Sequence, residues 1–218
     1  GPNGAGKTTT IRVALGLLRP TAGAARLLGG PPSRETRRGL GYVPQSLGLW
    51  QDLTVTENLA FVARGFGVAP PVLPDDLVAT ADVPVGALSL GHRRRVAFLA
   101  ALAHDPRLLV LDEPTSGVGP LERTRLWDQV HAAAEGGAGV LVTTHHMAEA
   151  EQCDRVVVMA AGRVVAEGPV DDLLADRRTV TVRSDDWAAT FARLDGAFGS
   201  VSLHGHEVRV PDASSADV

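Results

Sequence analysis

The first eight residues of the chain, GPNGAGKT, constrain its fold more than any other segment. They match the phosphate-loop pattern of a glycine, four further residues and then Gly-Lys-Ser/Thr, which joins a buried strand to a helix. Lys7 is the only lysine among the 21 basic residues. A compact ammonium group on a flexible stem suits the phosphates of a nucleotide. The segment therefore predicts a nucleotide-binding α/β domain.

Each part of this loop has an expected role. The glycines let the backbone curl so that its N–H groups face the β- and γ-phosphates, which Lys7 bridges, while the Thr8 hydroxyl binds Mg²⁺. A glycine-rich turn before an ordinary helix is the alternative interpretation. The residues that we expect to bind the nucleotide are Gly1, Pro2, Asn3, Gly4, Ala5, Gly6, Lys7, Thr8 and Thr9.

A second motif, which is acidic, supports the interpretation of the first eight residues as a phosphate loop. The apolar run 108–111 has the composition of a buried parallel strand and leads directly into Asp112 and Glu113. A carboxylate at this position, beside a phosphate loop, is placed to hold the Mg²⁺ shell. A second carboxylate after it can take a proton from an attacking water. Alone, the pair is equally consistent with a strand that happens to end in acidic loop residues.

Composition excludes several other classes of protein. The net charge of −4 gives no reason to expect a nucleic-acid partner. One cysteine, Cys153, excludes an internal disulfide and fits a reducing cytosol. The longest apolar runs have about eight residues, whereas a membrane-spanning helix needs about 20. Any role at a membrane must therefore be peripheral and depend on a partner.

Strand and helix patterns alternate along most of the chain, which favours a mostly parallel sheet. The predicted helices cover residues 7–18, 55–64, 75–81, 90–104, 121–135, 147–152 and 170–175. The predicted strands cover residues 24–28, 40–43, 108–111, 139–143, 155–159 and 163–167. Because a buried strand normally precedes a phosphate loop and none precedes Gly1, we expect a fragment that lacks its N-terminal strands.

The pattern changes near residue 178. A strand at 179–183, a helix at 187–194 and a hairpin of 201–203 with 207–210 predict a small βαββ appendage. We therefore expect the phosphate-loop domain at 1–177, an accessory C-terminal domain at 178–211 and a disordered tail at 212–218.

Five motifs follow one another in a fixed order. They are the phosphate loop, Gln45 after its strand, the run LSLGH at 88–92, the run DEPTSG at 112–117, and TTH at 143–145. In this order they resemble the phosphate loop, Q-loop, signature, Walker B with D-loop, and switch histidine of ABC transporter nucleotide-binding subunits. The resemblance covers residues 1–168. It implies a P-loop NTPase of the ABC type, with a mostly parallel sheet and a helical subdomain at about 46–104.

The resemblance also implies roles for individual residues. Glu113 is the general base or orients the water, His145 contacts the γ-phosphate, and Gln45 contacts Mg²⁺ and the water and senses a membrane partner. Ser89 and Gly91 act in trans, on ATP held by a second protomer. Taken singly, the plainer interpretations are stronger: Ser89 could be only a helix cap, His145 a surface histidine and Gln45 a turn residue. Their order along the chain favours the functional roles.

The chain departs from the family pattern in two places. Leu90 replaces the first glycine of the signature and His92 replaces its glutamine, and leucine does not adopt positive φ easily. Gly119 stands where the D-loop has an aspartate, which bears on communication between two sites. The basic run 93–95 could contact phosphate or lipid, but the interpretation that we favour is a solvated face of the helix.

The run TTHHMAEAE at 143–151 resembles that of ABC-2-type exporters, which include drug-efflux ATPases. The βαββ appendage also resembles their accessory domain. This implies ATP- and Mg²⁺-dependent efflux of a drug-like or other substrate through a separate membrane permease, with a second ATPase protomer or tandem half. The chain would lie peripherally on the cytoplasmic face of the cell membrane.

Two alternatives remain. A soluble ABC ATPase acting on ribosomes or DNA usually carries tandem cassettes or a coiled-coil insertion, and the 44 residues from Gln45 to Ser89 leave no room for a coiled coil. A nucleotide-gated binding module with weak hydrolysis is favoured by Leu90 and Gly119 and opposed by Glu113 and His145.

Overall fold

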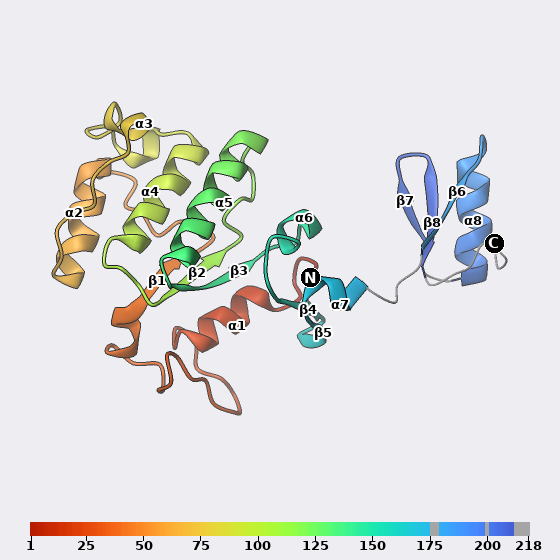
Figure 1. Cartoon of the computed structure of the whole chain (residues 1–218), viewed down its shortest axis with the longest axis horizontal. Helices are drawn as coiled ribbons and strands as arrows, with labels where there is room; N and C mark the ends of the chain where they lie inside the picture. The colour runs from red at the N-terminus through yellow and green to blue at the C-terminus, as the bar shows by residue number, and fades with distance from the viewer. Residues whose placement is uncertain (175–178, 199–200, 212–218) are drawn as a thin grey trace. The chain divides into compact units, whose positions relative to one another are not determined.

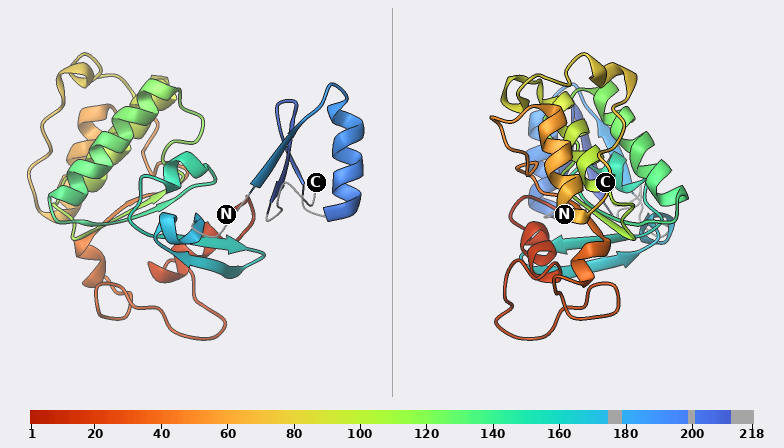
Figure 2. Two further views of the ribbon diagram at one scale, coloured as in Figure 1. Left: turned by 45° about the vertical axis from the view of Figure 1, so that its right-hand side comes forward. Right: turned by 90° about the vertical axis from the view of Figure 1, so that its left-hand side faces the viewer.

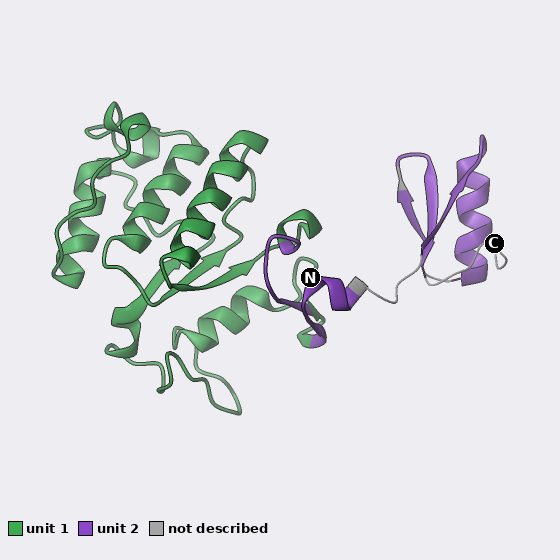
Figure 3. Cartoon of the chain, in the orientation of Figure 1, with its two compact units in different colours: residues 1–149, 159–163 green, residues 150–158, 164–218 purple. Residues whose placement is uncertain are grey.

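The computed structural model describes residues 1–174, 179–198 and 201–211, which form two compact units (Figure 3). Unit 1 contains Gly1–Glu149 and Met159–Arg163, and unit 2 contains Ala150–Val158 and Val164–Val218. The expected boundary at residue 177 does not coincide with this division, and the domain limits stay a prediction. The expected tail at 212–218 lies outside the described residues.

Helices and strands alternate along the first part of the chain, as expected. In chain order the elements are α1 (Lys7–Ala14), η1 (Thr36–Gly39), β1 (Leu40–Val43), α2 (Val55–Phe66), α3 (Asp75–Val78), η2 (Val85–Ala87), α4 (Leu90–Leu102), β2 (Leu108–Asp112), α5 (Pro120–Glu135), β3 (Gly139–Thr143) and α6 (Met147–Ala150). A two-stranded sheet of β4 (Val156–Ala160) and β5 (Arg163–Gly168) follows, and then α7 (Val170–Leu174).

The central sheet of unit 1 has the order β1-β2-β3, and both pairings are parallel, which confirms the prediction. Figure 1 shows α1 on one side of this sheet and α4 and α5 on the other. Side chains of α1 and the sheet form one apolar cluster that includes Ile11, Leu15, Leu40 and Val110. Because all three strands run the same way, the residues that follow them gather at one edge.

Helices α2, α3 and α4 share a second apolar core, which contains Val55, Leu59, Leu77, Val85, Leu88, Val96 and Ala100. The N-terminus of α2 has a capping box, in which the Thr54 side chain accepts from the Glu57 N–H and the Glu57 carboxylate accepts from the Thr54 N–H. This group of helices corresponds to the predicted helical subdomain, whose limits at about 46–104 stay a prediction.

Several elements differ from the sequence-based expectation: the helix expected at 75–81 ends at Val78, and the helix expected at 187–194 continues to Phe198. Helix α1 ends at Ala14 rather than at residue 18, because Gly16 has φ of 69° and turns the chain away from the helix axis. The strand expected at 24–28 is wrong: only an isolated bridge joins Leu27 to Gly30. Between them Leu28 and Gly29 have φ of 50° and 86°, which closes a two-residue turn.

Beyond residue 178, unit 2 contains the predicted βαββ sequence of elements. These are β6 (Thr179–Arg183), α8 (Trp187–Phe198), β7 (Ser202–His204) and β8 (Glu207–Pro211). The three strands form an antiparallel sheet in the order β6-β8-β7, and α8 packs against one face of it (Figure 2). Leu194 of α8 packs with Val208 and Val210 of β8 in a buried apolar cluster.

Candidate functional site

The phosphate loop leads directly into α1, with backbone N–H groups available at the helix start. Gly4 and Gly6 have φ of 77° and 98°, a left-handed conformation that glycine adopts without strain. Gly6 is the N-cap residue, and no side chain in the described part of the chain caps that end of α1. Lys7 Nζ donates to the carbonyl oxygens of Gly1 at 2.7 Å and Pro2 at 2.9 Å, so the ammonium group lies across the loop. The arrangement suits a bound anion.

Asp112 ends β2 beside the phosphate loop and is 1% exposed. Its Oδ1 accepts hydrogen bonds from the Thr8 hydroxyl at 3.1 Å and the Thr143 hydroxyl at 2.6 Å. Its Oδ2 is buried and has no hydrogen-bond partner among the described residues. Burial, and next the charge of Asp112, raise the pKa of Tyr42 nearby. A free carboxylate oxygen beside a threonine hydroxyl is a donor set that fits Mg²⁺.

Glu113 follows in the left-handed region, with φ of 52°. Its N–H donates to the Thr143 carbonyl at 3.2 Å and to the Thr143 hydroxyl at 3.0 Å. Its Oε1 lies 3.9 Å from Lys7 Nζ and 3.6 Å from His145 Nδ1. The structure thus brings together the three side chains that the sequence analysis placed around the γ-phosphate.

Gln45 lies two residues beyond β1, at the same edge of the sheet, because Val43 pairs with Leu111 in the parallel register. Within the described residues it makes no hydrogen bond to Thr8 or Asp112. Its expected contact with Mg²⁺ therefore stays a prediction.

The signature segment begins α4. The Ser89 hydroxyl accepts from the His92 N–H at 3.2 Å, so Ser89 is the N-cap residue. A Cβ at Gly91 would lie 3.1 Å from Glu122 Cγ, so a larger residue there would require the Glu122 side chain to shift. Leu90 has no positive φ and starts the helix, so the leucine introduces no backbone strain. A side chain at Gly119 would enter open space.

The interpretation of residues 93–95 as a solvated face is wrong for two of the three. Arg94 and Arg95 are each 6% exposed. Arg94 Nη1 donates to the carbonyls of Glu113 at 2.9 Å and Pro114 at 2.5 Å, and Nη2 donates to that of Ser116. Burial lowers the pKa of Arg94 below its ordinary value, and the charges of Glu113 and Glu149 oppose this effect only in part. The signal that reveals this burial is the helical spacing of residues 90, 94, 97 and 101.

Glu149 is a further residue that sequence reasoning missed. It is 1% exposed, and its Oε1 accepts from the Thr115 hydroxyl while its Oε2 accepts from the Thr144 hydroxyl at 2.6 Å. Arg123 Nε lies 3.5 Å from Oε1. Glu149 therefore joins the loop after β2 to the loop that carries His145.

Unit 1 also contains an apolar groove of about 270 Å³ between the segment after α1, β1, α2 and α4. Its lining includes Leu15, Leu17, Tyr42, Leu49, Val62, Phe66 and His104. The ring of His104 stacks on Phe66 at 3.6 Å, and its Nε2 lies 3.0 Å from the Leu40 carbonyl oxygen. Trp50 lies in the loop before α2 and is 48% exposed, and Phe61 lies on α2 and is 54% exposed. Their two rings contact each other.

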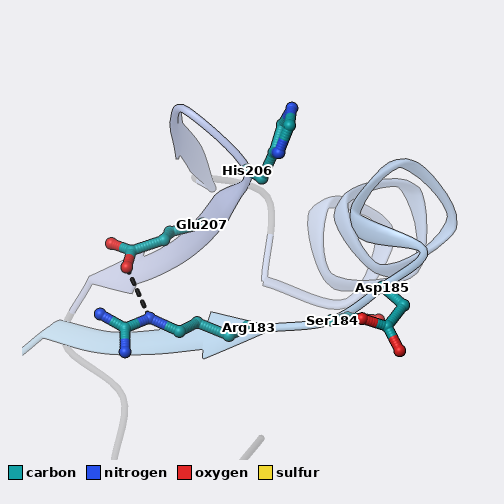
Figure 4. Close-up of a pocket in the computed structure, with 5 residues that line it drawn as sticks. All are labelled: Arg183, Ser184, Asp185, His206 and Glu207. Atoms are coloured by element: carbon teal, nitrogen blue, oxygen red, sulfur yellow. Dashed lines mark hydrogen bonds and ion pairs between the residues drawn. The ribbon is translucent and has the colours of Figure 1, made fainter.

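In unit 2 a shallow hollow of about 540 Å³ lies at the end of β6 and the start of β8 (Figure 4). It is lined by Arg183, Ser184, Asp185, His206 and Glu207. Arg183 Nε donates to Glu207 Oε1 at 2.6 Å. None of the residues that the sequence analysis selected lines this hollow.

A phosphate loop at the start of a helix, with an acidic pair at the end of the neighbouring parallel strand, defines a P-loop NTPase. The ABC transporter family model matches residues 1–116, and the chain belongs to this family, with the mixed α/β fold of its ATPases. Within the described residues, no helix has the length and apolar character needed to cross a bilayer.

The chain is also similar to individual proteins of this family. The chain is 46% identical over 181 residues to the Nod factor export ATP-binding protein I of Burkholderia orbicola, covering 77% of this chain and 60% of that protein. It is 41% identical over 187 residues to the probable multidrug ABC transporter ATP-binding protein YbhF of Escherichia coli, covering 80% of this chain and 32% of that one. A solved ATP-binding subunit of an ABC transporter superposes with a TM-score of 0.73 at 33% identity, covering 80% of this chain and 78% of that chain.

Proposed function

We propose that the chain binds and hydrolyses ATP as the nucleotide-binding subunit of an ABC exporter. The observation that carries the proposal is that the Glu113 carboxylate lies close to Lys7 and His145, next to Asp112. The relatives named for Nod factor export and multidrug transport support export. The chain spans about 60% of the first of these relatives.

In the proposed reaction each residue has one task. The loop 1–9 and Lys7 bind the phosphates, and Glu113 accepts a proton from the attacking water. His145 donates a hydrogen bond to the γ-phosphate. Thr8, Asp112 and Gln45 would hold Mg²⁺, which supplies positive charge against the phosphates when bound.

Two partners complete the proposal. Ser89 and Gly91 would contact ATP bound to a second protomer, since a helix N-terminus favours an anion. An ABC-2-type permease would dock at the apolar groove and the exposed rings of Trp50 and Phe61, because exposed aromatic residues beside an apolar groove are typical of interfaces. The chain would then lie on the cytoplasmic face of the membrane.

The test is magnesium-dependent ATP hydrolysis by the complete protein together with its membrane subunit. We expect Glu113→Gln to lower kcat by about 10²–10⁴-fold while ATP binding is retained, because only proton transfer is removed. Glu151→Gln makes the same change of charge at an exposed position and serves as the control. An unchanged rate in Glu113→Gln would remove this residue from the mechanism. Binding of ATP by the wild type without hydrolysis would instead support the nucleotide-gated module.

A further inference from the structure

Three carbonyl groups of the loop after β2 converge on the guanidinium group of Arg94. The residues that provide them are Glu113, Pro114 and Ser116. Arg94 belongs to α4, lies in the interior of unit 1 and is 6% exposed. A planar guanidinium presents several donors in a fixed geometry, so one side chain can orient several peptide groups at once.

The backbone of Glu113 requires such support. A non-glycine residue with φ of 52° is in a sparsely populated conformation, which persists only where its surroundings hold it. The N–H of Glu113 donates to Thr143, and its carbonyl accepts from Arg94. The peptide groups on both sides of the Glu113 Cα are therefore fixed, and the direction of its carboxylate follows from them.

We propose that Arg94 is a positioning residue, which holds Glu113 in the orientation that hydrolysis needs. The inference rests on the proposed ATPase function. Arg94 touches neither the phosphate loop nor the Glu113 carboxylate through a hydrogen bond; it acts through the backbone of residues 113–116. Its removal is expected to affect the chemical step and to leave nucleotide binding at Lys7 in place.

Arg95 provides a matched control on the same helix. It is also 6% exposed, and it forms an ion pair with Asp76 of α3, far along the chain from the loop after β2. Arg94→Met and Arg95→Met each remove one buried guanidinium from α4. A general loss of stability would be common to both variants, whereas a positioning role would separate them.

The experiment measures steady-state ATP hydrolysis and affinity for a non-hydrolysable ATP analogue in the complete protein with its membrane subunit. In Arg94→Met we expect kcat to fall by about 10- to 100-fold, as for a displaced catalytic group, with analogue affinity almost unchanged. Arg94→Lys should recover part of the rate, because an ammonium group can still donate to one or two of the carbonyls. Arg95→Met should keep a much larger share of the wild-type kcat.

Amide hydrogen exchange at residues 113, 115 and 116 gives a second readout that does not depend on hydrolysis. Exchange should rise in Arg94→Met and not in Arg95→Met. Unaltered exchange, a wild-type kcat in Arg94→Met, or equal loss of kcat in the two variants would overturn the inference. A wild-type protein without ATPase activity would refute the proposed function, and the exchange experiment would still decide the role of Arg94.

Discussion

The hydroxyl of Thr143 shows how much one side chain can determine in this site. It donates to Asp112 Oδ1 at 2.6 Å and accepts from the Glu113 N–H at 3.0 Å. Both acidic residues therefore take their orientation from the last residue of β3. Because Asp112 Oδ1 already accepts two hydrogen bonds, Oδ2 is the oxygen that is left to a cation.

Thr143→Val tests this dependence with almost no change in side-chain volume. Leaving buried groups without partners is expected to lower the free energy of unfolding by about 1–3 kcal/mol. ATP hydrolysis should also require more Mg²⁺ for half-maximal rate, since Asp112 loses its orientation. Urea denaturation and a Mg²⁺ titration of the rate would measure these effects. Thr143→Ser keeps the hydroxyl and should behave like the wild type; an equal loss in both variants would contradict the prediction.

Among the elements, α2 depends on one buried amide. Asn58 is fully buried; its Oδ1 accepts from the Trp50 N–H, and its Nδ2 donates to the carbonyls of Trp50, Leu53 and Thr54. These hydrogen bonds close the loop that connects the Q-loop segment to α2. Exposed Trp50, in the proposed permease surface, is therefore held by an interior residue.

Asn58→Ala should lower the free energy of unfolding by about 1–3 kcal/mol, because it leaves buried peptide groups of this loop unpaired. Urea denaturation followed by circular dichroism would measure the change. Arg64→Ala, at an exposed position on the same helix, should have little effect. A stability of Asn58→Ala equal to that of Arg64→Ala would contradict the assigned role.

Sequence reasoning located those elements whose signals are local. Strands 40–43 and 139–143 have the predicted limits, because short apolar runs bounded by glycine or proline specify them. Gly16 is a local signal for the end of α1, but the sequence analysis placed that end at residue 18, just before Pro20. The sequence motifs also indicated Lys7, Glu113 and His145, which lie close together in the structure, and their roles stay predictions.

What escaped sequence reasoning depends on tertiary contacts. Arg94 and Glu149 are charged residue types that are normally exposed, so only the partners that surround them explain their burial. Asn58 looks like an ordinary helix residue until the loop before α2 folds over it. Contacts of this kind join segments that no local pattern connects.

At the scale of the whole molecule, His104 connects stability to pH. Burial lowers its pKa below the ordinary value of 6.5, although the hydrogen bond with Leu40 and the charge of Asp105 oppose this. As pH falls below 6.5, the unfolded chain takes up a proton before the folded chain does. The contribution of His104 to stability is thus fully present above this pH and is lost as the pH falls further.

His104→Gln should therefore reduce the loss of stability between about pH 7.5 and pH 5.5, since glutamine does not titrate in this range. Urea denaturation at the two pH values, for the variant and the wild type, gives the difference directly. The other histidines contribute equally to both proteins and cancel. A pH dependence that is the same in both would show that His104 is not protonated differently on unfolding.

Glu149 has a consequence for the timing of the reaction cycle. One carboxylate accepts hydrogen bonds from Thr115, two residues beyond Glu113, and from Thr144, next to His145. Neither loop can shift alone without breaking a bond in the interior, so Glu113 and His145 should engage and release a nucleotide as a single step. Half-assembled intermediates, in which one of the two has closed and the other has not, would be sparsely populated.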